Sequence, residues 1–435
     1  MNTALVARLH AGVGEQLDER DSADEAHGRR PLGSDDRRQL ARQLLVQQLG
    51  GLDAERMTDG QSPITDAEAQ DLSTAVLNRI FGLGRLQDYI DDAQWTDIHA
   101  NGCDEVWLTR QDGTVMRGDP VADSDAELIE LIQTQARRGR SEQRWDPASP
   151  ELDMQLPSGD RLHAIAWVSG RPSISIRRHN FAIGRLEQLI SFGTISESLW
   201  HLLSAMVHAR FNVIIAGGTG AGKTTLLRCL INEVPADERI ITVEDSLEIG
   251  LDHYAAEHPN RVDLEAREAN VEGVGEFAMH RLVRSGLRMQ PDRVIVGEVR
   301  GAEVLPMMLA MSQGNDGSMC TIHADSSHGV FPRLQMYMAM TPERFSVEVT
   351  NLMIANAVHF IVHLARLDSN DRVVTSVREI SGAEGPVVMS NEVFGPDATG
   401  RAMPRFPLQD QTLRRLERAG FDSRWLAPRN AGWTR

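Results

Sequence analysis

A glycine-rich loop near the middle of the chain carries residues suited to hold a triphosphate. It follows an apolar run at residues 211–216 and precedes a helical pattern at residues 226–233. The spacing G-x-x-x-x-G-K-T lets the backbone turn tightly with its N–H groups toward phosphate oxygens, and a helix N-terminus behind it favours an anion. The predicted nucleotide-binding residues are Gly217, Gly218, Thr219, Gly220, Ala221, Gly222, Lys223, Thr224 and Thr225.

Two side chains of this loop have distinct predicted tasks. Lys223 is expected to reach the β and γ phosphates, and the Thr224 hydroxyl is expected to face Mg²⁺. A glycine-rich turn can show such a pattern by chance, but the flanking strand and helix patterns favour the functional interpretation. The sequence therefore predicts binding of a nucleoside triphosphate together with Mg²⁺.

Carboxylates follow two later strand patterns. An apolar run at residues 240–243 is followed by Glu244 and Asp245, and a second run at residues 293–297 is followed by Glu298. Hydrolysis of a triphosphate needs one carboxylate near the metal and another near the attacking water. Either acid alone is more often a solvated strand end, whereas both together after a phosphate loop favour hydrolysis.

The elements that must position these residues alternate between strand and helix patterns. A helical pattern at residues 195–207 leads into the loop, and a buried helix running into a strand is expected at residues 352–364. This alternation predicts an α/β fold with a parallel-sheet core covered by helices and a ligand at the carboxyl ends of the strands. The expected core strands lie at residues 211–216, 239–243, 293–296 and 318–322.

The N-terminal part of the chain has a different character. Apolar residues recur at helical spacing over residues 38–49 and 66–83, which predicts a helical module at residues 1–84. Residues 15–36 are rich in charge, Gly and Ser, and we expect them to be mobile.

A smaller mixed α/β domain is expected next, at residues 85–178. Short strand patterns fill residues 97–115, an amphipathic helix follows at residues 126–138, and a hairpin surrounds the turn at residues 157–160. We interpret residues 179–194 as a linker, residues 195–389 as the nucleotide-binding domain and residues 390–435 as a C-terminal extension.

Composition bounds the setting. The chain has 45 basic and 62 acidic residues and few aromatic side chains, which argues against nucleic acid as the main partner, although a local basic face is compatible with that total. The three cysteines lie far apart without a C-x-x-C pair, which argues against a disulfide framework or a zinc site and favours a reducing cytosol. No window has the length and apolarity of a signal peptide or a membrane span, so we expect a cytoplasmic protein that reaches a membrane only through partners.

Several motifs in one order carry a family resemblance. Residues 244–248 look like an aspartate box, residues 296–301 are similar to a Walker B segment, and residues 314–324 look like a histidine box. With the loop, these four motifs resemble the type II/type IV secretion ATPase superfamily, most closely its CpaF group, the pilus assembly ATPases of tight-adherence systems. The resemblance covers residues 86–382 approximately and implies a RecA-like P-loop ATPase domain. Asn315 departs from the pattern, because His is expected there, while Gly317, Ser318, Thr321 and His323 remain.

The resemblance implies roles for acidic and histidine residues. Glu244 would be the catalytic acid that orients water, and Glu298 would hold Mg²⁺ directly or through water. His323 would sense the γ phosphate and couple it to domain movement, as a neutral imidazole or as its cation.

Four arginines stand at positions that the resemblance associates with charge compensation. Arg284 and Arg288 would point from the motor domain toward phosphate, while Arg161 and Arg177 of the N-terminal α/β domain would close over the nucleotide. A planar guanidinium suits this task because it binds phosphate oxygens bidentately. Some of these arginines would act across a subunit boundary, which requires a ring, and the family suggests a hexamer.

The sequence thus predicts a cytoplasmic hexameric motor that hydrolyses ATP with Mg²⁺. Nucleotide-driven closure of two α/β domains would power pilus assembly or secretion through a membrane-embedded platform protein. The alternatives are a type IV secretion traffic ATPase that moves protein or DNA, a nucleotide-gated scaffold with little turnover, and a DNA translocase. The missing four-cysteine insert argues against the zinc-bearing type II secretion branch.

Overall fold

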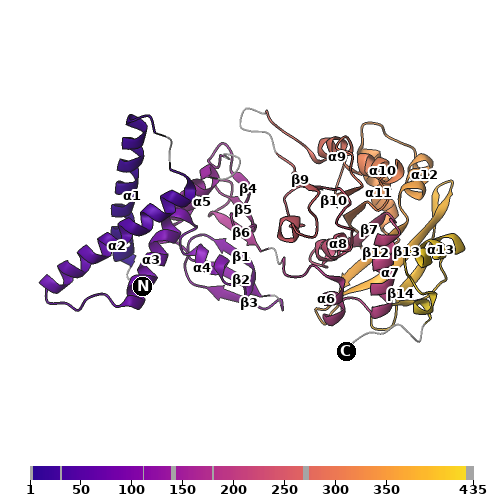
Figure 1. Ribbon diagram of the computed structural model, residues 1–435, viewed down its shortest axis with the longest axis horizontal. Coiled ribbons are helices and arrows are strands. Elements are labelled where there is room, and N and C mark those ends of the chain that lie inside the picture. Colours follow the sequence, from indigo (N-terminus) through magenta and orange to yellow (C-terminus); the bar gives the residue numbers. More distant parts are fainter. Residues whose placement is uncertain are drawn as a thin grey trace. The chain divides into compact units, whose positions relative to one another are not determined.

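The chain divides into two compact units, Met1–His179 and Asn180–Arg435, in the computed structural model shown in Figure 1. The predicted linker boundary at residues 179 and 180 and the last eight residues of the predicted extension lie outside the described residues. The structure describes residues 3–29, 32–110, 112–138, 144–178, 181–267 and 274–427.

Three helices form the N-terminal part of the first unit. They are α1 (Thr3–Ala26), α2 (Ser34–Thr58) and α3 (Asp66–Phe81). The expectation that residues 15–36 are mobile is wrong for residues 15–26, which continue α1. Val13 and Leu17 lie on one helical stripe with Val6 and Leu9, and this stripe is buried against α2 and α3. Most charged residues of α1 lie on its other faces, and because they are so many, composition alone does not reveal this stripe.

A six-stranded antiparallel sheet follows in the order β3-β2-β1-β6-β5-β4. One face is apolar, with Ile98, Leu162 and Ile176 packed in a single core with Leu128 and Ile132 of helix α5. The other face is polar, because side chains alternate across a strand. The elements are α4 (Leu86–Asp91), β1 (Trp95–Asn101), β2 (Val106–Arg110), β3 (Val115–Gly118), α5 (Asp125–Arg138), β4 (Glu151–Gln155), β5 (Arg161–Ile165) and β6 (Ser173–Arg177).

The second unit is built on a nine-stranded sheet in the order β15-β14-β13-β12-β7-β11-β10-β8-β9. The strands from β12 to β9 in this order are parallel, so the predicted parallel core and the RecA-like class are confirmed. The strands are β7 (Val213–Gly217), β8 (Ile240–Glu244), β9 (Arg261–Glu265), β10 (Arg293–Val299), β11 (Met319–His323), β12 (Phe360–Arg366), β13 (Arg372–Glu384), β14 (Val387–Pro396) and β15 (Ala402–Pro404).

Helices cover both faces of this sheet, as Figure 1 shows. On β7, Val213 and Ile215 join the core with α6, α7, α8 and α13, whereas Ile214 and Ala216 join the core with α9 to α12. A strand buried on both faces explains the continuous apolar run before the loop. The helices are α6 (Leu186–Ser191), α7 (Glu197–His208), α8 (Lys223–Ile231), α9 (Met279–Leu287), α10 (Val304–Ser312), α11 (Val330–Met340), α12 (Val347–Ala357) and α13 (Asp410–Arg418), with the short 3-10 turns η1 (Leu251–Tyr254) and η2 (Ser423–Leu426).

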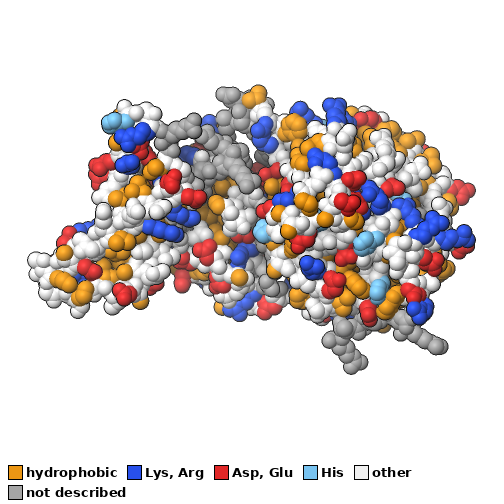
Figure 2. Space-filling view, viewed as in Figure 1, with side chains coloured by type: hydrophobic (Ala, Val, Ile, Leu, Met, Phe, Trp, Pro, Cys, Tyr) orange, Lys and Arg blue, Asp and Glu red, His pale blue; other side chains and the backbone are white. Residues whose placement is uncertain are grey.

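Two segments contribute more to this unit than their composition indicates. Helix α6 lies inside the range interpreted as a linker, and its Leu186 and Leu189 are buried in the core. Beyond residue 390, Phe394 and Leu416 are also buried there. No helix in the described ranges is both long and apolar enough to cross a bilayer. Acidic and basic side chains are interspersed on the visible face of the second unit in Figure 2.

Candidate nucleotide-binding site

The glycine-rich loop joins β7 to α8, as the sequence predicts. Gly220 and Gly222 have φ angles of +71° and +98°, in the left-handed region that favours glycine. A Cβ on Gly217 would lie 2.5 Å from the carbonyl oxygen of Leu364 on β12. The loop therefore needs glycine both for its turn and for close packing against the neighbouring strand.

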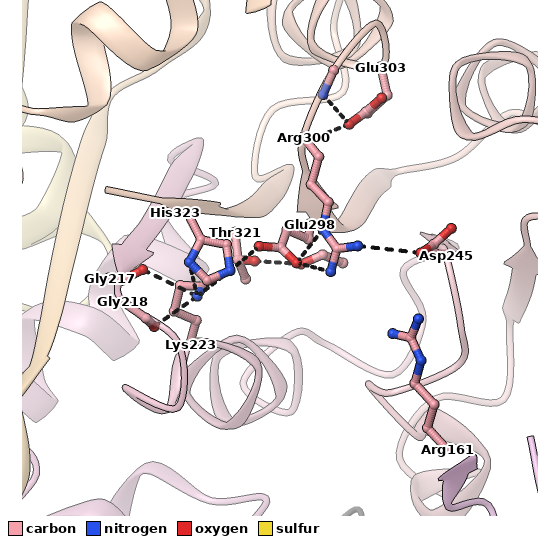
Figure 3. Close-up of polar contacts among 12 residues, drawn as sticks. Arg161, Gly217, Gly218, Lys223, Asp245, Glu298, Arg300, Glu303, Thr321 and His323 are labelled. Atoms are coloured by element: carbon pink, nitrogen blue, oxygen red, sulfur yellow. Dashed lines mark hydrogen bonds and ion pairs between the residues drawn. The ribbon is translucent and has the colours of Figure 1, made fainter. Parts of the chain in front are cut away.

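Lys223 begins α8 and is only 8% exposed. Its Nζ donates to the carbonyl oxygens of Gly217 and Gly218 at 3.2 and 3.1 Å and lies 3.4 Å from both ring nitrogens of His323. Burial lowers the pKa of Lys223. The ammonium group thus lies within its own loop and beside the histidine box (Figure 3).

Lys223 is also the only lysine of the chain, because every other one of the 45 basic Lys and Arg residues is arginine. A compact ammonium fits inside a phosphate loop, whereas a guanidinium is larger and has a fixed planar fork. In a chain that otherwise uses arginine, the lysine at this position indicates a specific chemical requirement.

Glu298 and His323 meet at the same edge of the sheet. Strand β11 lies between β7 and β10, so His323 at the end of β11 is next to both the loop and Glu298. His323 Nε2 is 2.6 Å from Glu298 Oε1. Burial lowers the pKa of His323, and the Glu298 carboxylate opposes that shift. The structure therefore brings together Lys223 at the start of α8, His323 of β11 and Glu298 of β10.

Arg300 forms an ion pair with the second carboxylate oxygen of Glu298. Its Nε and Nη2 donate to Glu298 Oε2 at 2.8 and 2.5 Å, and its Nη1 is 3.5 Å from an oxygen of Asp245 (Figure 3). Glu303 in turn accepts the backbone N–H groups of Arg300 and Gly301. The sequence reasoning assigned no role to Arg300 or Glu303, although Arg300 lies within the Walker B segment and could have been noted there.

Glu244 ends β8, the strand paired with β10, and is 3% exposed. Its Oε2 accepts the backbone N–H groups of Glu248 and Ile249, both at 2.8 Å. Burial raises the pKa of Glu244 to about 8, although these two hydrogen bonds oppose the shift. A carboxyl group with a pKa near neutral is suited to exchange a proton with a reacting group.

The residues predicted to hold Mg²⁺ have a suitable donor set. Thr224 lies in the first turn of α8 and supplies a hydroxyl, and Glu298 supplies a carboxylate. Oxygen ligands of this kind suit Mg²⁺, which is usually held by one or two protein oxygens together with phosphate and water. Glu298 Oε1 is buried and, among the described residues, accepts no hydrogen bond of good geometry, although His323 Nε2 lies 2.6 Å away, so its lone pairs suit a cation.

The histidine box is tied to its neighbours by backbone contacts. Thr321 Oγ1 donates to the carbonyl oxygen of Gly297, the residue before Glu298, at 2.7 Å. The Gly317 and Ser318 N–H groups bind Asn212 Oδ1 at 2.9 and 3.1 Å. Asn315, which stands where His was expected, donates to the carbonyl oxygen of Pro291 at 2.6 Å. These contacts hold β11 in register beside β10.

The two arginines predicted from the motor domain belong to helix α9 and its C-terminal end. Arg284 is on α9 with Nη2 3.8 Å from Glu343 Oε1, and Arg288 ends the same helix. In the part of the chain that the structure describes, no hydrogen bond or ion pair joins either side chain to Lys223, Glu298 or His323.

The arginines predicted from the first unit are neighbours on its sheet. Arg161 on β5 and Arg177 on β6 are direct cross-strand partners. Each also lies near an aspartate of the same sheet: Arg161 Nη2 is 3.5 Å from Asp153 Oδ1, and Arg177 Nε is 3.2 Å from Asp97 Oδ1. The structure therefore places the two residues side by side on the polar sheet face, with their guanidinium groups directed to aspartates of the flanking strands β4 and β1.

Comparisons with known proteins agree on one group. The family model described as type II/IV secretion system protein covers residues 82–401. A putative conjugal transfer protein of Mycobacterium tuberculosis is 34% identical over 314 residues, which are 70% of this chain and 86% of that protein. The type IV secretion system protein VirB11 of Brucella suis is 29% identical over 312 residues, with 65% and 84% of the two chains covered.

Two solved structures are also similar. The crystal structure of the VirB11 ATPase from the Brucella suis type IV secretion system, in complex with sulphate, is 28% identical with a TM-score of 0.36, over 70% of this chain and 96% of that chain. The pilus retraction motor PilT with bound ADP is 15% identical with a TM-score of 0.48, over 72% and 83% of the two chains.

Proposed function

We propose an ATP-driven motor, and the premise is that the chain belongs to the type II/IV secretion system protein family. The resemblance to this superfamily is thereby confirmed, while the CpaF group remains a prediction. The observation that supports hydrolysis best is that His323 lies between Lys223, which follows the loop after β7, and Glu298 of β10, at one edge of the parallel sheet. Ligands bind at this edge in open α/β sheets.

In the proposed site the loop backbone and Lys223 bind the triphosphate, and Thr224 and Glu298 hold Mg²⁺. The metal ion would neutralise phosphate charge while it is bound. Glu244 positions the attacking water and accepts its proton. His323 responds to the γ phosphate, a role supported by its contacts with both Lys223 and Glu298.

The arginines complete the charge compensation in this proposal. Arg161 and Arg177 supply a pair of guanidinium groups from the first unit, and Arg284 and Arg288 supply charge from α9, within one subunit or across a subunit boundary. The two arginines of the first unit are supported by their direct pairing on one sheet face. We infer a hexamer, in which closure of the two units around nucleotide does mechanical work.

The proposed work is pilus assembly or secretion through a membrane-embedded platform, performed from the cytoplasm. The type IV secretion alternative is supported by the relatives whose names refer to conjugal transfer and type IV secretion. We expect DNA-stimulated, salt-sensitive turnover only if DNA is the transported substrate, since polyanion binding depends strongly on salt.

A phosphate-release assay on the full chain tests this proposal directly. We expect Mg²⁺-dependent release of phosphate from ATP, with Glu298→Gln as the inactive control. Release equal to that of the control would instead favour the nucleotide-gated scaffold. The single lysine gives an independent binding assay, because an amine-reactive reagent can modify only Lys223 and the N-terminal amine. ATP should protect the Lys223 peptide from modification, as followed by mass spectrometry.

A further inference from the structure

We propose that Arg228 is a positioning residue for the proposed hydrolysis and holds the Glu244 carboxyl group in place relative to the phosphate loop. Arg228 lies on α8, the helix that begins with Lys223, and is 3% exposed. The inference rests on the proposed role of Glu244 and adds a residue to which no motif assigns a role.

Arg228 and Glu244 both form hydrogen bonds with the backbone of the same two residues, Arg228 with their carbonyl oxygens and Glu244 with their N–H groups. Arg228 Nε donates to the carbonyl oxygen of Ile249 at 2.6 Å, and its Nη2 donates to the carbonyl oxygen of Glu248 at 2.9 Å. The N–H groups of Glu248 and Ile249 are the donors to Glu244 Oε2. A shift of residues 248 and 249 would therefore move the donors that orient the Glu244 carboxyl group.

The same guanidinium also binds the start of the second unit. Its Nη1 donates to the carbonyl oxygen of Ile183 at 3.3 Å, and its Cζ lies 5.0 Å from the ring centre of Phe181. Asn232, just after α8, donates to the carbonyl oxygen of Gly184 at 2.8 Å. Helix α8 thus connects the phosphate loop, the segment after Glu244 and the segment that follows the boundary between the units.

The chemistry of this contact requires arginine. A guanidinium presents several N–H donors in a fixed planar fork, which can serve three carbonyl oxygens in different directions. A lysine ammonium keeps the charge but concentrates its donors on one atom. An uncharged glutamine has two N–H donors and a shorter stem, so it would leave buried carbonyl oxygens unpaired.

Position matters at Glu244 because a small displacement of a catalytic group has a large kinetic effect. A misplacement of about 1 Å can lower a rate on the order of 100-fold. Since α8 also carries Lys223 and Thr224, Arg228 fixes Glu244 to the helix that carries the phosphate and metal ligands. Its loss should therefore lower kcat while leaving nucleotide binding largely intact.

Arg415 offers a matched control within the same unit. It too donates to two backbone carbonyl oxygens, of Ala209 and Arg210, and lies over an aromatic ring, that of Phe211. We compare Arg228→Gln, Arg228→Lys and Arg415→Gln as full-length proteins. We expect kcat to fall roughly 10- to 100-fold in Arg228→Gln, less in Arg228→Lys, and not in Arg415→Gln.

The split between binding and turnover separates positioning from a general structural role. The KM for ATP and the protection of Lys223 from amine modification should change less than about threefold in Arg228→Gln. In a Glu244→Gln background, Arg228→Gln should have little further effect, because both changes remove one function. Wild-type kcat in Arg228→Gln, or an equal loss in both backgrounds, overturns the proposal.

Failure of the proposed role of Glu244 and failure of the positioning role of Arg228 give different results. If Glu244→Gln itself turns over ATP like the wild type, the proposed role of Glu244 fails, and the positioning role of Arg228 fails with it. If Glu244→Gln is inactive but Arg228 variants are fully active, only the present inference fails. Should Arg228→Gln not fold, Arg228→Lys, which keeps the charge, carries the same comparison of kcat with KM.

Discussion

The two sheets of the molecule place charged residues in different ways. In the second unit, the parallel strands β7, β11 and β10 end at one edge, where His323 contacts both Lys223 and Glu298. In the first unit, an antiparallel sheet places Arg161 and Arg177 side by side on a face, where each lies near an aspartate.

The difference shows which part of the proposed site is formed by one unit alone. The edge of the parallel sheet already contains the glycine-rich loop, the carboxylate proposed to bind Mg²⁺ and a histidine. The arginines of the first unit each have an aspartate partner, and their other N–H donors can serve phosphate in the proposed reaction, because a guanidinium carries five donors in a planar fork. We expect the second unit to determine whether nucleotide binds and the first unit to affect mainly how fast it reacts.

The largest expected effect comes from the single lysine. Lys223→Ala and Lys223→Arg should each lower phosphate release on the order of 100- to 1,000-fold, because a phosphate ligand is lost or replaced by a group that does not fit the loop. Phosphate release and the assembly state by light scattering measure the outcome, and we expect assembly to persist. Wild-type activity in Lys223→Arg would show that the loop needs only a positive charge.

Glu298→Gln tests the carboxylate that we propose binds Mg²⁺ at the same edge. The amide keeps the shape but loses the charge that attracts Mg²⁺ and pairs with Arg300, so kcat should fall roughly 100-fold. Titration of Mg²⁺ against bound fluorescent nucleotide gives a second readout, in which the affinity for Mg²⁺ should weaken. An unchanged Mg²⁺ affinity would place the metal on other ligands.

The arginines of the first unit should have smaller effects. Arg161→Ala and Arg177→Ala should each lower kcat roughly 10-fold, as expected for loss of one charge-assisted hydrogen bond to phosphate. Arg171→Ala is the control, because Arg171 pairs with Asp104 and Asp125 away from this face. If Arg161 and Arg177 variants behave like Arg171→Ala, the first unit supplies no charge to the reaction and the comparison drawn above is wrong.

The smallest expected effect concerns stability in the core of the second unit. His359 Nδ1 accepts the N–H group of Asn212 at 3.0 Å, and burial lowers the pKa of His359 to about 4 from its usual 6.5. Since the unfolded chain binds this proton near pH 6.5 and the folded chain only near pH 4, the free energy of unfolding falls as the pH drops through this interval. The fall attributable to His359 between pH 7 and pH 5 is about 1 to 2 kcal/mol.

Urea unfolding at these two pH values measures this effect. His359→Gln should reduce the pH dependence, whereas the control His208→Gln, at an exposed position, should leave it unchanged. Equal pH dependence in wild type and His359→Gln would show that other buried histidines, such as His363, account for the acid sensitivity.

Patterns within short segments predicted the elements well. Three apolar runs, which precede the glycine-rich loop, Glu244 and Glu298, form strands β7, β8 and β10. A strand that is buried on both faces has a continuous apolar sequence. Residues 15–26 were misjudged because their charge-rich composition hides the stripe that Leu17 completes with Val6, Leu9 and Val13.

The sequence by itself determined the phosphate loop, the strand-end acids and the order of strands and helices, because these depend on neighbouring residues. Only the tertiary structure decided that His323 meets Glu298 and that Arg228 shares residues 248 and 249 with Glu244. These contacts join segments that lie far apart in the chain or in separate elements. Their partners are selected by packing and by the need to pair buried polar groups, which no local pattern records.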